Sequence, residues 1–223
     1  MNLLSRQVAL KENKVDRISI NPQTVNDEVL KTIGRKHTAQ QFFDAFELAR
    51  KCGFDNINTD LIAGLPTDTP ESFKNSLDSI VRLNAECITV HTLCMKRASR
   101  LTTEGVTLDL QQARDAREML AYTQNILGQN EYIPYYMYRQ SRMVGNLENV
   151  GWSKKGFESL YNVYVMDETH TILACGSGGV TKLKRNNPDY LERIFNFKYP
   201  YEYIDRFDEL IQRKSGIMQF YGQ

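Results

Sequence analysis

Cysteine is scarce in this sequence, and the spacings that make cysteines into a structural or metal site are missing. Four cysteines occur in 223 residues, at positions 52, 87, 94 and 175, and no two of them form a Cys-x-x-Cys pair. A secreted, disulfide-stabilised domain has a denser set, so we expect free thiols in a reducing compartment. The same spacing gives no zinc or iron–sulfur motif.

The sequence also lacks an excess of one charge and a long apolar run. Its 28 Lys and Arg against 27 Asp and Glu give a net charge of +1, which argues against nucleic acid or an anionic membrane surface as a partner. No apolar stretch approaches the ~18 residues of a membrane span, and residues 1–14 lack a signal-peptide core. We therefore expect a cytoplasmic protein.

Several catalytic motifs are missing as well. The histidines His37, His91 and His170 show no metal-ligand spacing, and there is no G-x-S-x-G elbow. The glycine-rich segment 176–179 matches neither the dinucleotide fingerprint nor the Walker motif, so a tight turn is expected there. These patterns give no support to a zinc hydrolase, a serine hydrolase or a P-loop protein.

What the sequence does contain is an alternation of short apolar strands and amphipathic helices. Thr38 and Gln41 form a capping box at the start of one helix, and Pro70 follows the expected cap Thr69 of another. Strands separated by helical patterns predict two parallel βαβ units and an α/β fold. The expected strands are residues 17–21, 57–62 and 87–93.

The second half of the sequence predicts a small α+β unit. Residues 109–127 favour an amphipathic helix, and residues 161–166 and 171–175 favour a hairpin. Residues 188–212 alternate charged and aromatic side chains, which favours helix. A tyrosine cluster, serving either as core or as an aromatic wall for a flat ligand, lies at positions 132, 135, 136 and 138.

Candidate ligand contacts lie where the predicted parallel strands end. Asp60 lies in an apolar strand, where its charge needs either a ligand hydroxyl or a structural bond to backbone or to Arg17. Gln23 offers both a donor and an acceptor, or else caps a turn. Arg35 has the planar fork that clamps a carboxylate, or else is a solvated surface residue. The strand ends also select residues 21–23, 64–66 and 91–95.

Several segments match a known family in both order and spacing. They are RISINPQ (17–23), NDEVLKTIGR (26–35), HT (37–38), GFDNIN (53–58) and DLIAGLP (60–66). Together they resemble the oxygen-independent coproporphyrinogen III oxidase family, whose members are radical S-adenosylmethionine enzymes. The later segments YYMYRQ (135–140) and GNLENVG (145–151) look like its coproporphyrinogen dehydrogenase, or HemZ-like, branch. The resemblance runs from about Arg17 to Leu183.

This resemblance implies a fold and a division of the chain. Residues 1–107 would form the last three βα units of a partial radical-SAM (β/α)6 barrel. Residues 108–223 would form the family's small C-terminal α+β domain. The chain would then be the C-terminal portion of a larger enzyme, with the N-terminal half of the barrel as its missing partner.

The resemblance also implies a cofactor and its contacts. S-adenosylmethionine would be bound by Gln23, Arg35, Asp60, Cys94 and Val180, the last two through backbone. The family's Cys-x-x-x-Cys-x-x-Cys loop, which holds a [4Fe–4S] cluster, is absent, so no metal ligand and no catalytic residue is expected in this chain. Candidate contacts to the porphyrinogen are Tyr135, Tyr136, Arg139, Asn146 and Asn149.

The function implied for the full-length enzyme is haem biosynthesis. It would oxidatively decarboxylate two propionates of coproporphyrinogen III to vinyl groups, giving protoporphyrinogen IX, by a radical S-adenosylmethionine mechanism. This chain alone would be inactive. Two alternatives stay open: a haem chaperone-like relative, and a non-catalytic truncated fragment or interaction module.

Overall fold

The computed structural model describes residues 3–94, 110–140, 143–186 and 189–222. They fall into two compact units, Met1–Glu158 and Ser159–Gln223. Helix α6 (Leu110–Gln129) and two strands after it belong to the first unit, so the compact units divide later than residue 107. The domain boundary expected at residue 107 separates the domains of the family rather than these compact units, and it stays a prediction.

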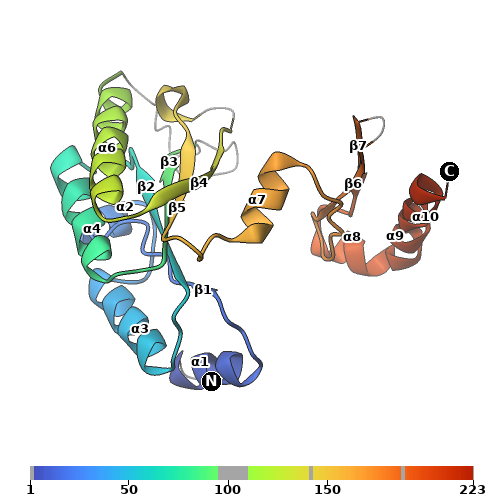
Figure 1. The fold of residues 1–223 in the computed structure, drawn as a ribbon, viewed down its shortest axis with the longest axis horizontal. Helices are drawn as coiled ribbons and strands as arrows, with labels where there is room; N and C mark the ends of the chain where they lie inside the picture. The colour runs from blue at the N-terminus through green and yellow to red at the C-terminus, as the bar shows by residue number, and fades with distance from the viewer. Residues whose placement is uncertain (1–2, 95–109, 141–142, 187–188, 223) are drawn as a thin grey trace. The chain divides into compact units, whose positions relative to one another are not determined.

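A five-stranded sheet organises the first unit (Figure 1). Strands β1, β2 and β3 run parallel, β5 runs antiparallel to β3, and β4 runs antiparallel to β5. The parallel part confirms the two predicted βαβ units and leaves β1 at one edge of the sheet. In spatial order the strands are β1 (Ile18–Ser19), β2 (Ile57–Ala63), β3 (Cys87–Thr92), β5 (Asn149–Ser153) and β4 (Ile133–Tyr138).

Helices α2, α3 and α4 of the first unit begin where the sequence predicts, whereas α1 was not predicted. Thr38 and Gln41 form the capping box, and the Thr69 side chain accepts from the backbone N–H of Ser72. Asn26 caps the short helix in the same way. The elements are α1 (Leu3–Glu12), α2 (Asp27–Thr32), α3 (Ala39–Lys51), α4 (Pro70–Arg82), α6 and the 3₁₀ turn η1 (Val144–Asn146).

Helix α6 differs from expectation at its end. The sequence places the stop at Leu127 with Gly128 just beyond it, whereas the helix continues through Gly128 to Gln129. Gly128 does not adopt the left-handed backbone that ends many helices; Glu131 does, with φ of +64°. The prediction of the end at Leu127 is therefore wrong by two residues.

The two faces of the sheet differ because side chains alternate along each strand. Ile57, Leu61 and Ala63 of β2 are fully buried on the side covered by α3, α4 and α6 (Figure 1). Asn58 and Asp60 point to the opposite face. The apolar core on the helix side includes Phe46, Phe73, Leu77, Ile80, Met119 and Trp152.

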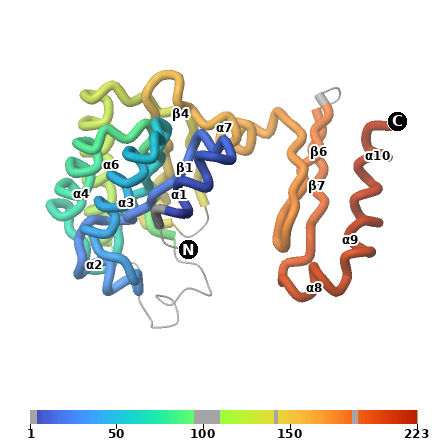
Figure 2. The backbone as a smooth tube through the Cα atoms, turned by 90° about the horizontal axis from the view of Figure 1, so that it is seen from below, coloured from blue at the N-terminus to red at the C-terminus, as the bar shows by residue number. Residues whose placement is uncertain are grey.

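The second unit is built on a hairpin of β6 (Val180–Asn186) and β7 (Asp189–Phe195). Helices α9 and α10 lie beside it (Figure 2), and Lys214 Nζ donates to Ala174 O at 2.6 Å. Leu183 and Leu210 are its most buried apolar side chains. Its helices are α7 (Leu160–Asp167), α8 (Pro200–Asp205), α9 (Phe207–Lys214) and α10 (Gly216–Tyr221).

Two predictions for the second unit are wrong. Residues 161–166 form helix α7 rather than a strand, because residues 171–175 pair with β6 instead, through Ile172 and Lys182. Residues 189–195 form strand β7 rather than a helix, since they pair along their whole length with β6. Short apolar runs fit either period, and the partner strand decides between them.

Among the residues that the structure describes, no helix is long and apolar enough to cross a membrane.

Candidate functional site

Polar side chains gather on the face of the first-unit sheet that faces away from α3, α4 and α6. The strands present them at alternate positions, since the apolar residues between them point into the core. The register places Asp60 of β2 beside Thr89 of β3. We call this set the polar face: Asn21, Asn58, Asp60, Thr89, His91, Tyr136 and Tyr138.

Asp60 is held at the centre of the polar face. Asn21 Nδ2 donates to Asp60 Oδ2 at 2.8 Å, and Asn58 Nδ2 donates to Asp60 Oδ1 at 2.7 Å. His91 Nε2 lies 3.6 Å from Asp60 Oδ2, and the Asp60 side chain is 19% exposed. Each carboxylate oxygen has lone pairs beyond these bonds, so the group can accept further hydrogen bonds from a ligand.

Arg17 does not pair with Asp60, although the sequence left that open. It lies near Cys87 instead: burial raises the pKa of the Cys87 thiol, and the bond from Arg17 acts against this rise. The partners of Asp60 are two amides and an imidazole, which leave its charge available to a ligand.

The backbone of Gln23 is hydrogen-bonded to the backbone of Asp60. Its N–H donates to Asp60 O at 3.0 Å, and Ile62 N–H donates to Gln23 O at 2.9 Å. Gln23 has φ of +71°, an uncommon backbone for a residue with a side chain, and it is 8% exposed. The structure therefore brings together Gln23 and Asp60, two of the residues selected from the sequence.

Two tyrosines of β4 extend the polar face. Tyr138 OH lies 3.2 Å from His91 Nδ1, and Tyr136 OH lies 3.3 Å from Thr89 Oγ1. Thr89 Oγ1 in turn donates to Asn58 Oδ1 at 3.2 Å. Burial raises the pKa of Tyr136 to about 12 and also raises the pKa of Tyr138, so both phenols are neutral at physiological pH. They are hydrogen-bonding groups there rather than bases.

The other three expected cofactor contacts come from other elements of the chain. Arg35 follows α2, is exposed, and forms no ion pair with Asp60. Cys94 follows β3 and forms an isolated antiparallel bridge with Met143. Val180 begins β6 in the second unit.

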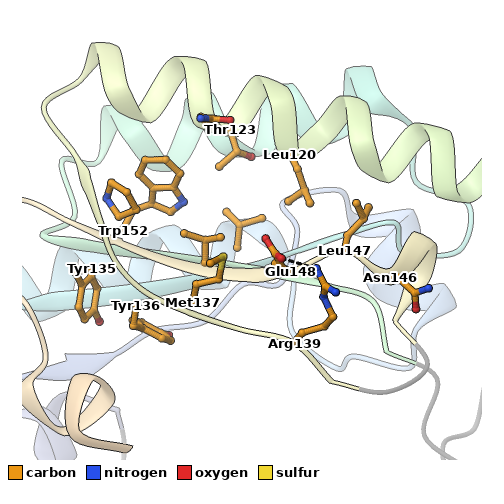
Figure 3. Close-up of a pocket in the computed structure, with 14 residues that line it drawn as sticks. Leu120, Thr123, Tyr135, Tyr136, Met137, Arg139, Asn146, Leu147, Glu148 and Trp152 are labelled. Carbon is orange, nitrogen blue, oxygen red and sulfur yellow. Dashed lines mark hydrogen bonds and ion pairs between the residues drawn. The ribbon is translucent and has the colours of Figure 1, made fainter. Parts of the chain in front are cut away.

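Four of the five candidate porphyrinogen contacts line one cavity of about 600 Å³ in the first unit (Figure 3). They are Tyr135, Tyr136, Arg139 and Asn146. The rings of Tyr135 and Tyr136 point away from α6 (Figure 3), and Tyr136 reaches the polar face. The fifth, Asn149, is buried and accepts the backbone N–H of Thr92 at 2.7 Å.

Sequence reasoning missed Asn58 and Thr89. Both lie inside strands rather than at their ends, so the rule that selects strand ends passes over them. The available signal was a partial alternation: Asn58 and Asp60 of β2, and Thr89 and His91 of β3, recur at every second position, which places them on one face of the sheet.

The residues present do not fit an iron–sulfur cluster. In the part of the chain that the structure describes, no three His, Cys, Asp or Glu side chains are grouped to hold a metal ion. Three thiolates on one loop are needed for the cluster of the family that the sequence resembles, and the four cysteines are scattered.

The comparisons with known proteins agree on one family. Residues 8–80 match the model of the Radical SAM superfamily. The chain is 38% identical, over 94% of its length and 42% of the relative, to the "oxygen-independent coproporphyrinogen-III oxidase-like protein HemZ" of Bacillus subtilis (strain 168). It is 33% identical to the "heme chaperone HemW" of Lactococcus lactis, over 80% of this chain and 45% of that protein.

A solved structure supports the fold. The coproporphyrinogen III oxidase HemN from Escherichia coli, a radical SAM enzyme, matches 92% of this chain and 46% of its own, with a TM-score of 0.67 at 19% identity. The chain thus spans less than half the length of each of these relatives. It is a member of the radical S-adenosylmethionine superfamily, in the oxygen-independent coproporphyrinogen III oxidase family and on its HemZ-like branch.

Proposed function

We propose that this chain forms part of a coproporphyrinogen III dehydrogenase and supplies part of its S-adenosylmethionine site. The reaction would convert two propionates of coproporphyrinogen III to vinyl groups and give protoporphyrinogen IX. The observation that carries the proposal is the Asp60 carboxylate, held by two amides on the polar face, with the backbone N–H of Gln23 bonded to the Asp60 carbonyl. The name of the HemZ relative supports the same reaction class.

The donor set fits the polar part of S-adenosylmethionine. Asp60 keeps lone pairs for ribose hydroxyls. A glutamine side chain such as that of Gln23 carries both a donor and an acceptor. Arg35 is the proposed partner of the methionine carboxylate, and backbone atoms of Cys94 and Val180 are proposed to complete the site. Bound S-adenosylmethionine would supply the radical that abstracts hydrogen from the substrate.

The porphyrinogen would lie over the tyrosines of β4. We propose Tyr135, Tyr136, Arg139, Asn146 and Asn149 as its contacts. Tyr136 supports this, because its hydroxyl joins the polar face through Thr89 while its ring forms an aromatic surface. The cluster and the remaining strands of the barrel would come from outside this chain, as the missing N-terminal half.

The sharpest test of the S-adenosylmethionine site is Asp60→Asn. The change keeps the shape of the side chain but removes the charge, so S-adenosylmethionine should bind at least about tenfold more weakly, as for the loss of one hydrogen bond to a charged group. Isothermal titration calorimetry measures this directly. Asp55→Asn is the matched control, because Asp55 is exposed and precedes β2. Equal binding by both variants, or none by the wild-type chain, contradicts the proposal.

The haem chaperone is the second candidate function. A relative named as a haem chaperone is 33% identical over 80% of this chain, which supports it. Titration of the full-length relative with haem, followed at the Soret band and combined with an assay for vinyl formation, separates the two functions. Tight stoichiometric haem binding without vinyl formation favours the chaperone, whereas vinyl formation with weak haem binding favours the dehydrogenase.

A further inference from the structure

Strand β7 of the second unit has one edge that pairs with no other strand among the residues that the structure describes. The hairpin is a two-stranded sheet, so β6 covers only one edge of β7. Helices α9 and α10 lie beside the hairpin (Figure 2), and Arg213 Nη1 reaches the end of the strand, where it donates to Phe195 O at 3.5 Å. The rest of this edge of β7 is open.

The register of the hairpin shows which backbone groups of β7 point outward. In an antiparallel pair, the N–H and C=O of successive residues point alternately toward the partner strand and away from it. Lys182 of β6 exchanges backbone hydrogen bonds with Ile172, on the side away from β7, so the groups of Arg193 opposite it also point outward. Leu191, two residues earlier, has the same orientation. No described residue bonds to the outward backbone groups of Leu191 or Arg193.

The side chains of β7 fit a second copy of the same strand. Asp189 and Arg193 lie four residues apart, with Leu191 midway between them. When two copies pair antiparallel with Leu191 opposite Leu191, each Asp189 lies opposite Arg193 of the other copy, and opposite charges across a strand pair are stabilising. Both side chains are accessible, since Asp189 is 81% and Arg193 is 43% exposed, although each also has an ion pair within its own chain.

The neighbouring registers of the same edge lack this complementarity. With Glu192 at the centre, two glutamates lie opposite each other, and like charges in that position are destabilising. With Tyr190 at the centre, Asp189 lies opposite Leu191 and gains no ion pair. Charged residues on an edge strand usually keep other strands away, but here their spacing favours one register with a second copy.

We propose that two copies of this chain associate along β7, so that their hairpins form one four-stranded antiparallel sheet. The pairing supplies partners for the backbone N–H and C=O groups of Leu191 and Arg193. It also brings the two Leu191 side chains together at the two-fold axis, and such a symmetric contact closes at a dimer. The inference concerns the second unit and does not depend on the function proposed above.

Charge reversal tests the pairing, because two variants complement each other only if their reversed charges meet. Arg193→Asp places aspartates opposite each other and should weaken self-association of the 223-residue chain about tenfold, and Asp189→Arg should do the same. An equimolar mixture of the two variants should form a heterodimer as tight as the wild-type dimer, since every cross-strand pair again joins an acidic and a basic group. Sedimentation velocity over a concentration series measures the dissociation constants.

The double variant, which carries both reversals in one chain, is the control for effects within a single copy. It does not restore the ion pairs of Asp189 with Lys184 and of Arg193 with Glu168, but it restores the pairs across the two-fold axis, so it should dimerise like the wild type. Association through another edge, such as β1, would be the same in all variants. A wild-type chain that stays monomeric up to millimolar concentration, or a mixture that associates no better than its two components, overturns the proposal.

Discussion

At the scale of single residues, Gly151 determines where the ring of Tyr136 can lie. A Cβ built on Gly151 would come within 1.8 Å of Tyr136 Cε1, a distance at which the ring must move. The Tyr136 hydroxyl meets Thr89 only because the ring lies flat over this glycine. A missing side chain on β5 therefore helps to build the polar face.

Gly151→Ala should destabilise the protein by about 1–3 kcal/mol, because the new methyl group overpacks the contact with the ring. Urea denaturation measures the loss. Gly128→Ala is the control: its Cβ meets nothing within 4 Å and it lies in α6, so it should stabilise by about 0.5–1 kcal/mol. Adding Tyr136→Ala should remove most of the Gly151→Ala penalty, and an undiminished penalty would show that the ring does not cause it.

The Tyr136 phenol gives a prediction about pH. Burial raises its pKa to about 12 in the folded protein, above the ordinary value of 10.0. The unfolded chain therefore loses this proton first as the pH rises, and the free energy of unfolding falls between pH 10 and 12. Because the group is partly exposed, we expect this fall in the free energy of unfolding to be on the order of 1–2 kcal/mol in the wild type. The Tyr136→Phe variant should not show it.

Denaturant titrations at several pH values measure this loss. Tyr161→Phe, which removes a phenol from a side chain that is 67% exposed, controls for the loss of a hydroxyl as such. Identical pH slopes for wild type and Tyr136→Phe would contradict the assignment.

At the scale of elements, nearby residues determine some helices, whereas strand pairing determines other elements. The N-caps and helical periods of α2, α3 and α4 were predicted correctly, with the capping box of α3 and the first-turn proline of α4, because each depends on residues a few positions apart. Helix α7 and strand β7 were not, because their structure depends on which strand lies next to β6. The same holds for Asn58 and Thr89, whose roles depend on the register of β2 against β3.

Thr38→Ala should cost about 1 kcal/mol, because the backbone N–H of Gln41 loses its acceptor at the start of α3. Thr38→Ser keeps the hydroxyl and should retain most of the stability. Thermal or urea unfolding compares the two. A Thr38→Ser protein as unstable as Thr38→Ala would show that the methyl group, and not the cap, matters.

At the scale of the whole molecule, this chain matches only part of the larger HemN fold. The chain covers 46% of the HemN structure, and β1 is an edge strand of two residues. Edge strands expose backbone groups that pair readily with another strand. This supports the proposal that further strands of the barrel pair at β1.

Anaerobic reconstitution with iron and sulfide tests the cluster prediction. We expect the 223-residue chain to hold no [4Fe–4S] cluster and not to cleave S-adenosylmethionine, because its described residues offer no group of three metal ligands. Absorption spectroscopy and iron analysis measure this. Stoichiometric cluster absorption in this chain would overturn the prediction.

The sequence by itself determined the parallel βαβ units, the helix caps and the family, because these depend on local periodicity and on motifs in a fixed order. It also selected Asp60 and Gln23 as candidate contacts. Only the tertiary structure decided that two amides and His91 hold Asp60, and that Tyr136 reaches Thr89 over Gly151. These contacts join residues from separate strands, and strand register, which brings them together, is set by the packing of the whole sheet.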